Sequence, residues 1–122
     1  MRILLIIGSL FAALSVLLGA FGAHGLKNRL SMEDLAIFET AVRYQMYHAL
    51  GILLMGAASF FLTEKLVSTP AYFLILGIII FSGSLFLLVF TNLRWFGAIT
   101  PIGGLCLIIG WLLFAYNIYF HA

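Results

Sequence analysis

The feature that most constrains this chain is the clustering of its charged residues. All ten Asp, Glu, Lys and Arg side chains of the 122 residues fall in a few short segments. They leave four uncharged stretches of 24, 20, 28 and 28 residues, at 3–26, 44–63, 66–93 and 95–122. About 20 apolar residues cross the hydrocarbon core of a bilayer as a helix. The spacing therefore predicts an integral membrane protein.

The composition agrees with this interpretation. Hydrophobic residues make up 65% of the chain and charged residues 8%, against about 45–50% and about 25% in ordinary globular proteins. These proportions exclude a soluble enzyme, a nucleic-acid binder and a disulfide scaffold. The net charge of +2 is too small and too scattered to indicate an anionic partner. The single cysteine, Cys106, cannot form an intrachain disulfide and is expected to be a packing residue.

We expect an all-α fold in which residues 1–122 form a single transmembrane domain. Its four transmembrane helices, packed as a compact bundle, should span about 3–23, 44–62, 71–90 and 99–119. The first of them also resembles a signal peptide, because Arg2 and an apolar stretch precede small residues at 20–23. Its apolar stretch is longer than a typical signal core, so we interpret it as the first span.

An amphipathic helical segment is predicted between the first two spans. Gly25 should end the first helix, and Ser31 should cap a new helix that carries Glu33 and Asp34 in its first turn. Residues 31–43 present one apolar stripe. A continuous helix from 32 to 62 would measure about 46 Å, which exceeds the roughly 30 Å hydrocarbon core. The segment should therefore project from the bilayer or bend along it.

Two prolines suggest further helix boundaries. Ser68, Thr69 and Pro70 are expected to break the chain before the third span. Thr100 and Pro101 are typical of a helix N-cap followed by proline in the first turn. Alternatively, the fourth helix starts near Trp95 and Pro101 kinks it.

Small residues recur at helical spacing in the first and fourth spans. Since lipid supplies no hydrophobic drive for helix association, small residues at an interface allow helices to approach closely. We expect helix packing through Gly8, Ala12, Ser15, Gly19, Gly22, Gly103, Cys106 and Gly110.

A weak internal repeat is visible at an offset of 75 residues. Eight of sixteen positions are identical between 8–23 and 83–98. A true duplication would relate two helix pairs as parallel repeats about an axis along the membrane normal.

Charge also predicts the orientation. Four spans place both termini on one side, with Arg2 and Lys65, and leave four Lys and Arg residues on the other side. Since these residues favour the cytoplasm in short loops, the first and third loops should be cytoplasmic and the termini outside.

Most polar side chains belong to the membrane end formed by the first and third loops. His48 is the sharpest observation, because an ionisable residue one turn inside a span marks a functional site or a hydrogen bond to a neighbouring helix. The hypothetical ligand-binding residues are His24, Glu39, Arg43, Tyr44, Gln45, Tyr47, His48, Asn92 and Thr100.

The same residues are candidates for a metal or haem site and for a catalytic site. His24 and His48 end and begin adjacent spans, at what the sequence suggests is a similar depth, but no HxxxH motif or Cys/His cluster accompanies them. No ionisable residue lies near the middle of a span, where a proton relay would need one. No metal, cofactor, catalytic residue or pumping activity is therefore predicted, and the chain is not expected to be an enzyme.

Four motifs, Gly19–Leu26, Thr40–Leu50, Phe81–Leu85 and Ile99–Gly104, occur in an order that resembles the bacterial family called domain of unknown function 423. The family comprises small bacterial membrane proteins of the UPF0382 type and has a eukaryotic relative, transmembrane protein 256. The resemblance covers essentially the whole chain and implies a four-helix protein of the bacterial cytoplasmic membrane. It implies no activity. Asn92 departs from the family pattern, in which many members have glycine after the threonine.

Two functions remain open at this stage. The first is a non-catalytic accessory, scaffolding or self-associating subunit, with membrane lipids and a protein partner or a second copy as contacts and no nucleic acid. The alternative is binding or passage of a small molecule or lipid, such as a headgroup or a quinone, at the polar end around His24, Arg43 and His48.

Overall fold

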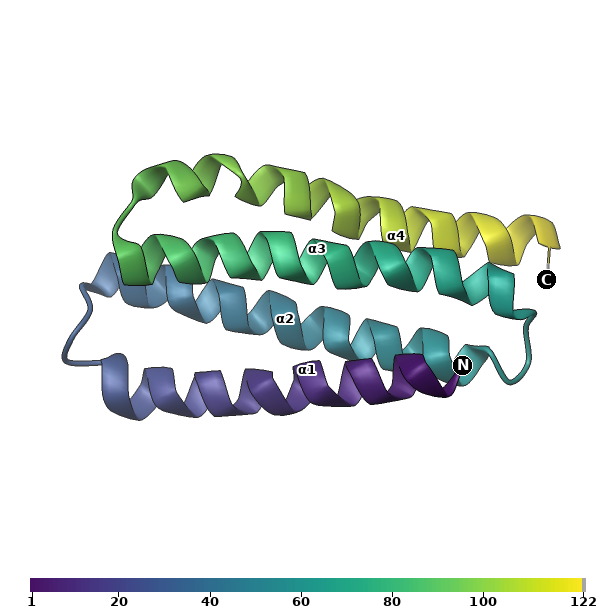
Figure 1. The fold of residues 1–122 in the computed structure, drawn as a ribbon, viewed down its shortest axis with the longest axis horizontal. Coiled ribbons are helices and arrows are strands. Elements are labelled where there is room, and N and C mark those ends of the chain that lie inside the picture. The colour runs from purple at the N-terminus through teal and green to yellow at the C-terminus, as the bar shows by residue number, and fades with distance from the viewer. Residues whose placement is uncertain (122) are drawn as a thin grey trace.

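The computed structural model describes residues 1–121, and these are helical throughout apart from short connections. The four α-helices run antiparallel in chain order, and Figure 1 shows both termini and the α2–α3 turn at one end. The other end holds the α1–α2 and α3–α4 connections. The predicted all-helical fold is confirmed. The elements are α1 (Arg2–Phe21), a π-helical turn η1 (Gly22–Leu26), α2 (Met32–Ala58), α3 (Glu64–Thr91), a 3₁₀ turn η2 (Arg94–Ala98) and α4 (Thr100–His121).

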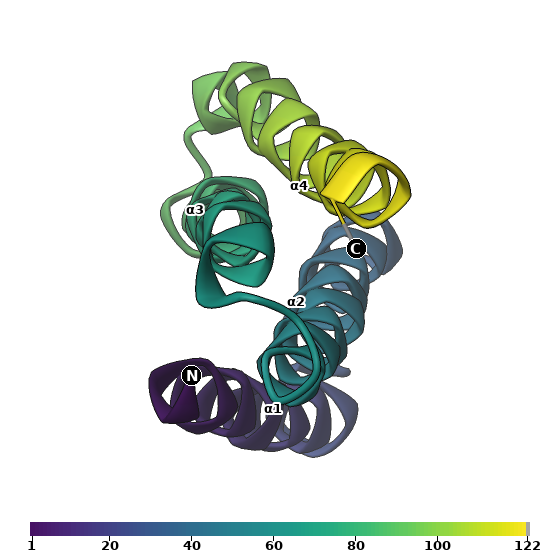
Figure 2. The ribbon, with the colours of Figure 1, turned by 90° about the vertical axis from the view of Figure 1, so that its right-hand side faces the viewer.

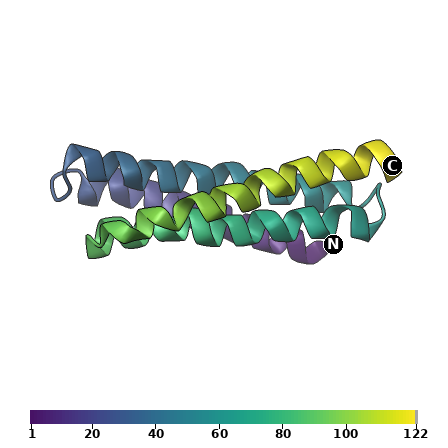
Figure 3. The same cartoon turned by 90° about the horizontal axis from the view of Figure 1, so that it is seen from above.

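The bundle has two inner and two outer helices. Each helix packs against its neighbour in the chain, and Figure 2 shows α1 and α4 on opposite sides of the α2–α3 pair. Seen from above in Figure 3, α4 crosses α3 obliquely. Two apolar clusters fill the interior, one toward the termini around Ile52 and Leu74 and one toward the connections around Phe38 and Leu88.

Three helical segments are long and apolar enough to cross a membrane, namely Arg2–Leu26, Glu64–Thr91 and Arg94–His121. α2 is as long as these segments but is more polar, because it carries Arg43, Gln45 and His48. It lies between α1 and α3 in the bundle, alongside helices that are themselves long and apolar. The fold is therefore a helical membrane bundle whose most polar helix is an inner one.

Glycines allow the helices of this bundle to approach closely. A Cβ atom added to Gly8 would lie 2.8 Å from Leu53 of α2, and one added to Gly22 would lie 2.6 Å from the Phe38 ring. On the other side of the bundle, a Cβ at Gly103 would lie 2.3 Å from the backbone nitrogen of Phe81. The small residues of α1 and α4 therefore contact helices of the same chain.

Gly110 is equally close to α3, since a Cβ there would lie 2.7 Å from Leu74, whereas the remaining members of the two small-residue stripes make looser contacts. A Cβ at Gly19 would meet Val42 at 3.5 Å, which is ordinary van der Waals distance. Ser15 is buried and donates its hydroxyl to the Phe11 carbonyl, whereas Ala12 and Cys106 are half-buried.

The amphipathic segment is the beginning of α2. Ser31 caps this helix as predicted, since its hydroxyl accepts a hydrogen bond from the Asp34 backbone nitrogen at 3.1 Å. The helix continues unbroken through residue 43. Phe38 is fully buried between Phe86 and Phe90 of α3, with ring centroids 5.4 and 5.9 Å away. The segment is thus a packed extension of the second helix.

The predicted break at Ser68, Thr69 and Pro70 is wrong, because α3 begins at Glu64 and includes Pro70. A proline inside a helix has no N–H for the carbonyl four residues earlier, which here belongs to Leu66. The side-chain nitrogen of Asn117 in α4 donates to that carbonyl at 3.0 Å. A neighbouring helix therefore supplies the hydrogen bond that Pro70 cannot make.

Two other predicted helix ends need correction. α1 ends at Phe21, and the π-helical turn that follows carries the chain through Gly25 to Leu26. Thr100 is not an N-cap, because its hydroxyl hydrogen-bonds to that of Ser84 in α3 and the preceding turn η2 is already helical.

The turn after α3 depends on Asn92. This residue has φ 58° and ψ 18°, the left-handed conformation that ends a helix. Glycine adopts this conformation most readily, and asparagine is among the other residues that tolerate it best. Asn92 therefore suits the left-handed position at which α3 ends.

The repeated sequence segments share α-helical structure only over their first nine positions. Residues 8–21 are continuous α-helix, whereas 83–98 include the end of α3, the Asn92 turn and η2.

Candidate functional site

Several polar side chains at the predicted polar end join helices to one another. Gln45 donates to the Phe11 carbonyl of α1 at 3.1 Å, and Ser82 of α3 donates to the Ala41 carbonyl of α2 at 2.7 Å. The Ser84–Thr100 hydrogen bond adds a link between α3 and α4. Within residues 1–121, every buried side-chain nitrogen or oxygen has a hydrogen-bond partner. Gln45 and Thr100 are thus engaged in packing.

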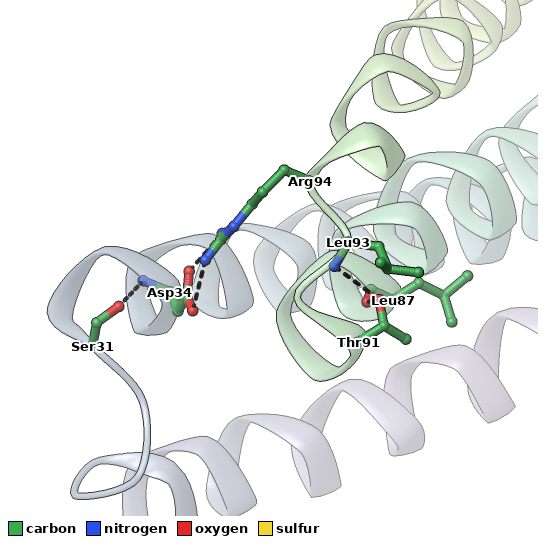
Figure 4. A network of polar contacts seen from close by, with 6 residues as sticks. All are labelled: Ser31, Asp34, Leu87, Thr91, Leu93 and Arg94. Carbon is green, nitrogen blue, oxygen red and sulfur yellow. Dashed lines mark hydrogen bonds and ion pairs between the residues drawn. The ribbon is translucent and has the colours of Figure 1, made fainter.

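A second group of polar residues ties the connections together (Figure 4). Arg94 of η2 donates two hydrogen bonds to the Asp34 carboxylate, at 2.8 and 3.2 Å. Asp34 also supplies the backbone nitrogen that Ser31 caps. Nearby, Thr91 accepts a hydrogen bond from the Leu93 nitrogen at 3.3 Å. This network holds the start of α2 against the α3–α4 connection, two segments that are 60 residues apart.

The third group is a surface patch on α2, which we call the α2 patch and define as Arg43, Tyr44, Tyr47 and His48. Arg43 is exposed and pairs with Glu39 at 3.7 Å. Tyr44 stacks on Phe81 with ring centroids 4.5 Å apart and keeps 39% of its surface exposed. Tyr47, with centroid 5.9 Å from the Tyr44 ring, is 56% exposed.

His48 is the buried member of the α2 patch. Its Nδ1 donates to the Tyr44 carbonyl at 2.7 Å, which assigns the proton to that nitrogen and leaves Nε2 as an acceptor. Its ring lies 6.0 Å from that of Trp111 in α4, and a Cβ at Gly51 would meet the same indole at 2.7 Å. His48 therefore lies at the contact between α2 and α4, with the Tyr44 ring beside it.

Of the other predicted ligand-binding residues, Glu39 reaches this patch through its ion pair with Arg43, whereas His24 and Asn92 do not. Gly22 lies against Phe38, so His24 in the antiparallel α1–α2 pair is level with about Ala36. His48 is twelve residues further along α2, which is about 18 Å at 1.5 Å per residue. The expected similar depth of the two histidines is wrong, because it took no account of helix register. Asn92 serves the turn after α3 and is exposed.

Among residues 1–121, no three His, Cys, Asp or Glu side chains are grouped so that they could hold a metal ion.

The opposite end of the bundle carries a polar cavity that sequence reasoning missed. A cavity of about 550 Å³ lies between the first turns of α3 and the last turns of α4. Lys65 and His121 were visible in the sequence as isolated polar residues. They form one cavity wall only because α3 begins before Pro70 and the ends of α3 and α4 lie side by side. The lining residues are Thr63, Lys65, Leu66, Thr69, Leu113, Asn117 and His121.

An apolar groove on the outer side of α3 is the other surface that the sequence did not indicate. It measures about 500 Å³ and runs beside the start of α4. Gly83 forms part of its wall, and a Cβ atom added there would meet no atom within 4 Å. We call this surface the Gly83 groove; its lining residues are Ile79, Ile80, Gly83, Ser84, Phe86, Leu87, Phe96 and Ile99.

Fold and surfaces together define a small polytopic helical membrane protein. The family profile described as "Protein of unknown function (DUF423)" matches residues 18–104. The chain belongs to this family.

Curated relatives extend the match to nearly the whole chain. A UPF0382 membrane protein of Staphylococcus saprophyticus is 49% identical over 113 residues, which covers 93% of each chain. A UPF0382 membrane protein of Staphylococcus haemolyticus is 48% identical over 113 residues, covering 93% of this chain and 92% of the relative. The UPF0382 membrane protein YwdK of Bacillus subtilis is 42% identical over 118 residues and 93% of each chain. No solved structure gives a significant match.

Proposed function

We propose that this protein is a non-catalytic membrane subunit that self-associates through the Gly83 groove. The observation that supports the proposal is the open position of Gly83. Gly8, Gly22, Gly77, Gly103 and Gly110 each face an atom that a Cβ would meet at 2.8 Å or less, whereas a Cβ at Gly83 would meet no neighbouring atom within 4 Å. A small residue at an open membrane-facing position permits close approach of a further helix.

On the outer face of α3, two exposed apolar side chains flank Gly83. Ile79 and Leu87 lie one turn before and one turn after Gly83 on the same helix, and both are exposed, at 57% and 47%. Two copies of α3 related by a two-fold axis can each place such a side chain over the Gly83 position of the other. This arrangement favours a second copy of the chain as the partner over an unrelated helix.

The test is the oligomeric state of the full-length protein, extracted gently from its own membrane and measured by native mass spectrometry. We expect a dimer for the native chain and a monomer for Gly83→Leu, because a leucine would fill the groove. Ala13→Leu is the matched control, since it adds bulk at an exposed position of α1 and should leave the dimer intact. Circular dichroism should give the same helicity for all three proteins.

A monomeric native chain, or a Gly83→Leu variant that stays dimeric, would refute self-association through this groove. Foreign subunits that co-isolate in fixed stoichiometry in place of a second copy would also refute it, and would identify an accessory subunit instead.

A second candidate function is the binding of a small amphiphile, a lipid headgroup or a quinone, at the α2 patch. It is favoured by the juxtaposition of the exposed Arg43 with Tyr44, Tyr47 and the free Nε2 acceptor of His48. Under this hypothesis, Arg43→Ala and His48→Ala abolish retention of a co-purified adduct while the bundle still folds. The matched control is Arg29→Ala, an exposed cation in the α1–α2 connection. Full retention in both test variants would rule out the α2 patch.

We further propose that the α1–α2 and α3–α4 connections face the cytoplasm in the bacterial cytoplasmic membrane. The proposal rests on four basic residues in or after these connections: Lys27 and Arg29 between η1 and α2, Arg94 at the start of η2, and Arg43 in the first half of α2. Single cysteines at Asn28 and Thr63, in a Cys106→Ala background, can be labelled in intact cells with an impermeant maleimide. Labelling at position 63 alone is expected, and labelling at position 28 alone would reverse the orientation.

A further inference from the structure

The polar cavity between α3 and α4 lies at the end of the bundle that holds both termini. It lies where α3 begins and α4 ends, so its mouth is level with the ends of two long apolar helices. In a bilayer, the ends of such helices lie at the level of the lipid headgroups. The cavity of about 550 Å³ is large enough to admit a phosphate and part of the group it carries.

The polar part of the lining of this cavity carries hydrogen-bond donors. Lys65 contributes an ammonium group, His121 an imidazole, and Thr63 and Thr69 contribute hydroxyl groups. Glu64, the acidic residue of the same turn, is not among the lining residues. A cavity with one fixed cation, a titratable ring and two hydroxyls suits the oxygen atoms of an anion, to which it can donate charge-assisted hydrogen bonds.

Asn117 fixes the two helices that line the cavity relative to each other. Its side-chain nitrogen is committed to the Leu66 carbonyl that Pro70 leaves without a backbone donor. This hydrogen bond joins the two helices directly at the cavity. The separation between Lys65 on α3 and His121 on α4 is therefore set by a specific contact.

An apolar cleft continues from the polar cavity. It measures about 140 Å³ and is lined by Thr69, Tyr72, Phe73 and Leu76. Thr69 lines both the cavity and the cleft. Since these residues stand at helix positions i, i+3, i+4 and i+7, the cleft follows one face of α3 away from the bundle end and toward its middle.

We infer that this composite site binds an anionic phospholipid. The phosphate lies in the polar cavity, within reach of Lys65, His121 and the Thr63 and Thr69 hydroxyls, and one acyl chain lies along Tyr72 and Leu76. A free phosphate would use only the cavity, whereas a phospholipid uses both the cavity and the cleft. The site is separate from the Gly83 groove and from the α2 patch, so it does not depend on either proposed function.

The test is lipid retention by the full-length protein in nanodiscs that contain equal amounts of phosphatidylglycerol and phosphatidylcholine with identical acyl chains. After transfer to detergent, native mass spectrometry counts the lipids that stay bound. We expect selective retention of phosphatidylglycerol by the native chain and about a tenfold loss in the double variant Lys65→Gln/His121→Gln, since two charge-assisted contacts disappear. Leu76→Trp, which fills the cleft, should lower retention while leaving the cavity intact.

Lys27→Gln is the matched control, because it removes an exposed cation at the other end of the bundle. It should retain phosphatidylglycerol as the native chain does. Circular dichroism and the melting temperature report whether the Leu76→Trp variant still folds, and Tyr72→Ala provides a second change in the cleft that removes contacts without adding bulk.

Three outcomes would overturn the inference. The first is equal retention of the two lipids by the native chain. The second is undiminished phosphatidylglycerol retention in Lys65→Gln/His121→Gln. The third is saturable binding of inorganic phosphate, followed by NMR of the detergent-solubilised protein, that competes fully with the lipid and is unaffected by changes in the cleft, because this would identify a free-anion site.

Discussion

Replacing Gly103 by alanine tests the packing of α3 against α4 directly. A Cβ atom at this position would lie 2.3 Å from the backbone nitrogen and 2.7 Å from the Cα of Phe81. Backbone atoms cannot rotate out of the way, so the helices must separate by about 1 Å to restore ordinary contact. Overpacking of this kind costs about 1–3 kcal/mol. The separation would also stretch the Ser84–Thr100 hydrogen bond.

Gly104→Ala is the matched control for this prediction. The next residue of the same helix would place its Cβ 3.7 Å from the Phe81 ring, which is ordinary contact. Both variants gain helix propensity of about 1 kcal/mol, so the difference between them reports packing alone. We expect Gly104→Ala to be neutral or stabilising and Gly103→Ala to be less stable than it by about 2 kcal/mol. SDS titration in mixed micelles, followed by circular dichroism, measures the two free energies of unfolding.

Equal stability of the two variants, or a more stable Gly103→Ala, would contradict the close approach of α4 to α3 at Phe81.

Three further predictions concern contacts that only the folded chain makes. Asn117→Ala should lower the free energy of unfolding by about 1 kcal/mol. The loss should be smaller in a Pro70→Ala background, where a backbone N–H is restored for the Leu66 carbonyl. Additive effects in this double-mutant cycle would contradict the idea that Asn117 replaces the hydrogen bond that Pro70 cannot make. Asn92→Gly should raise the free energy of unfolding by a few tenths of a kcal/mol, whereas Asn92→Val should lower it by about 1–2 kcal/mol; the reverse order would argue against the left-handed turn. Arg94→Gln and Asp34→Asn should lower the melting temperature by similar, small amounts that shrink at high salt, and a large loss in only one of them would show that the ion pair is not the cause.

The four-helix architecture was predictable because it depends on local properties of the chain. Burying a charge in hydrocarbon is costly, so the positions of charged residues mark the segments that can cross a bilayer. The Ser31 cap was predictable for the same reason, since its hydrogen bond to Asp34 spans only three residues. The role of Pro70 was not predictable in this way. Its effect depends on whether another helix supplies a donor, and that donor, Asn117, is far away in the chain.

The candidate sites likewise divide into features set by local sequence and features set by contacts between distant residues. The sequence predicted a similar depth for His24 and His48 because they end and begin adjacent spans. Their actual depths depend on the axial register of α1 against α2. It also directed attention to the end of the bundle with more polar residues. Several of those residues, among them Gln45 and Thr100, make hydrogen bonds between helices. The polar cavity at the opposite end is assembled from residues more than 50 positions apart, such as Lys65 and His121.

Hydropathy and charge spacing alone therefore determine that this chain is a helical membrane protein, how many helices it has and which end of the bundle is more polar. These properties follow from the transfer of each segment between water and hydrocarbon, which does not depend on the other segments. Only the tertiary structure decides which glycines are covered by neighbouring helices and that Gly83 is left open to the outside. The rotation and register of each helix decide this, and they follow from the fit of side chains between helices, which the composition of a single segment does not specify.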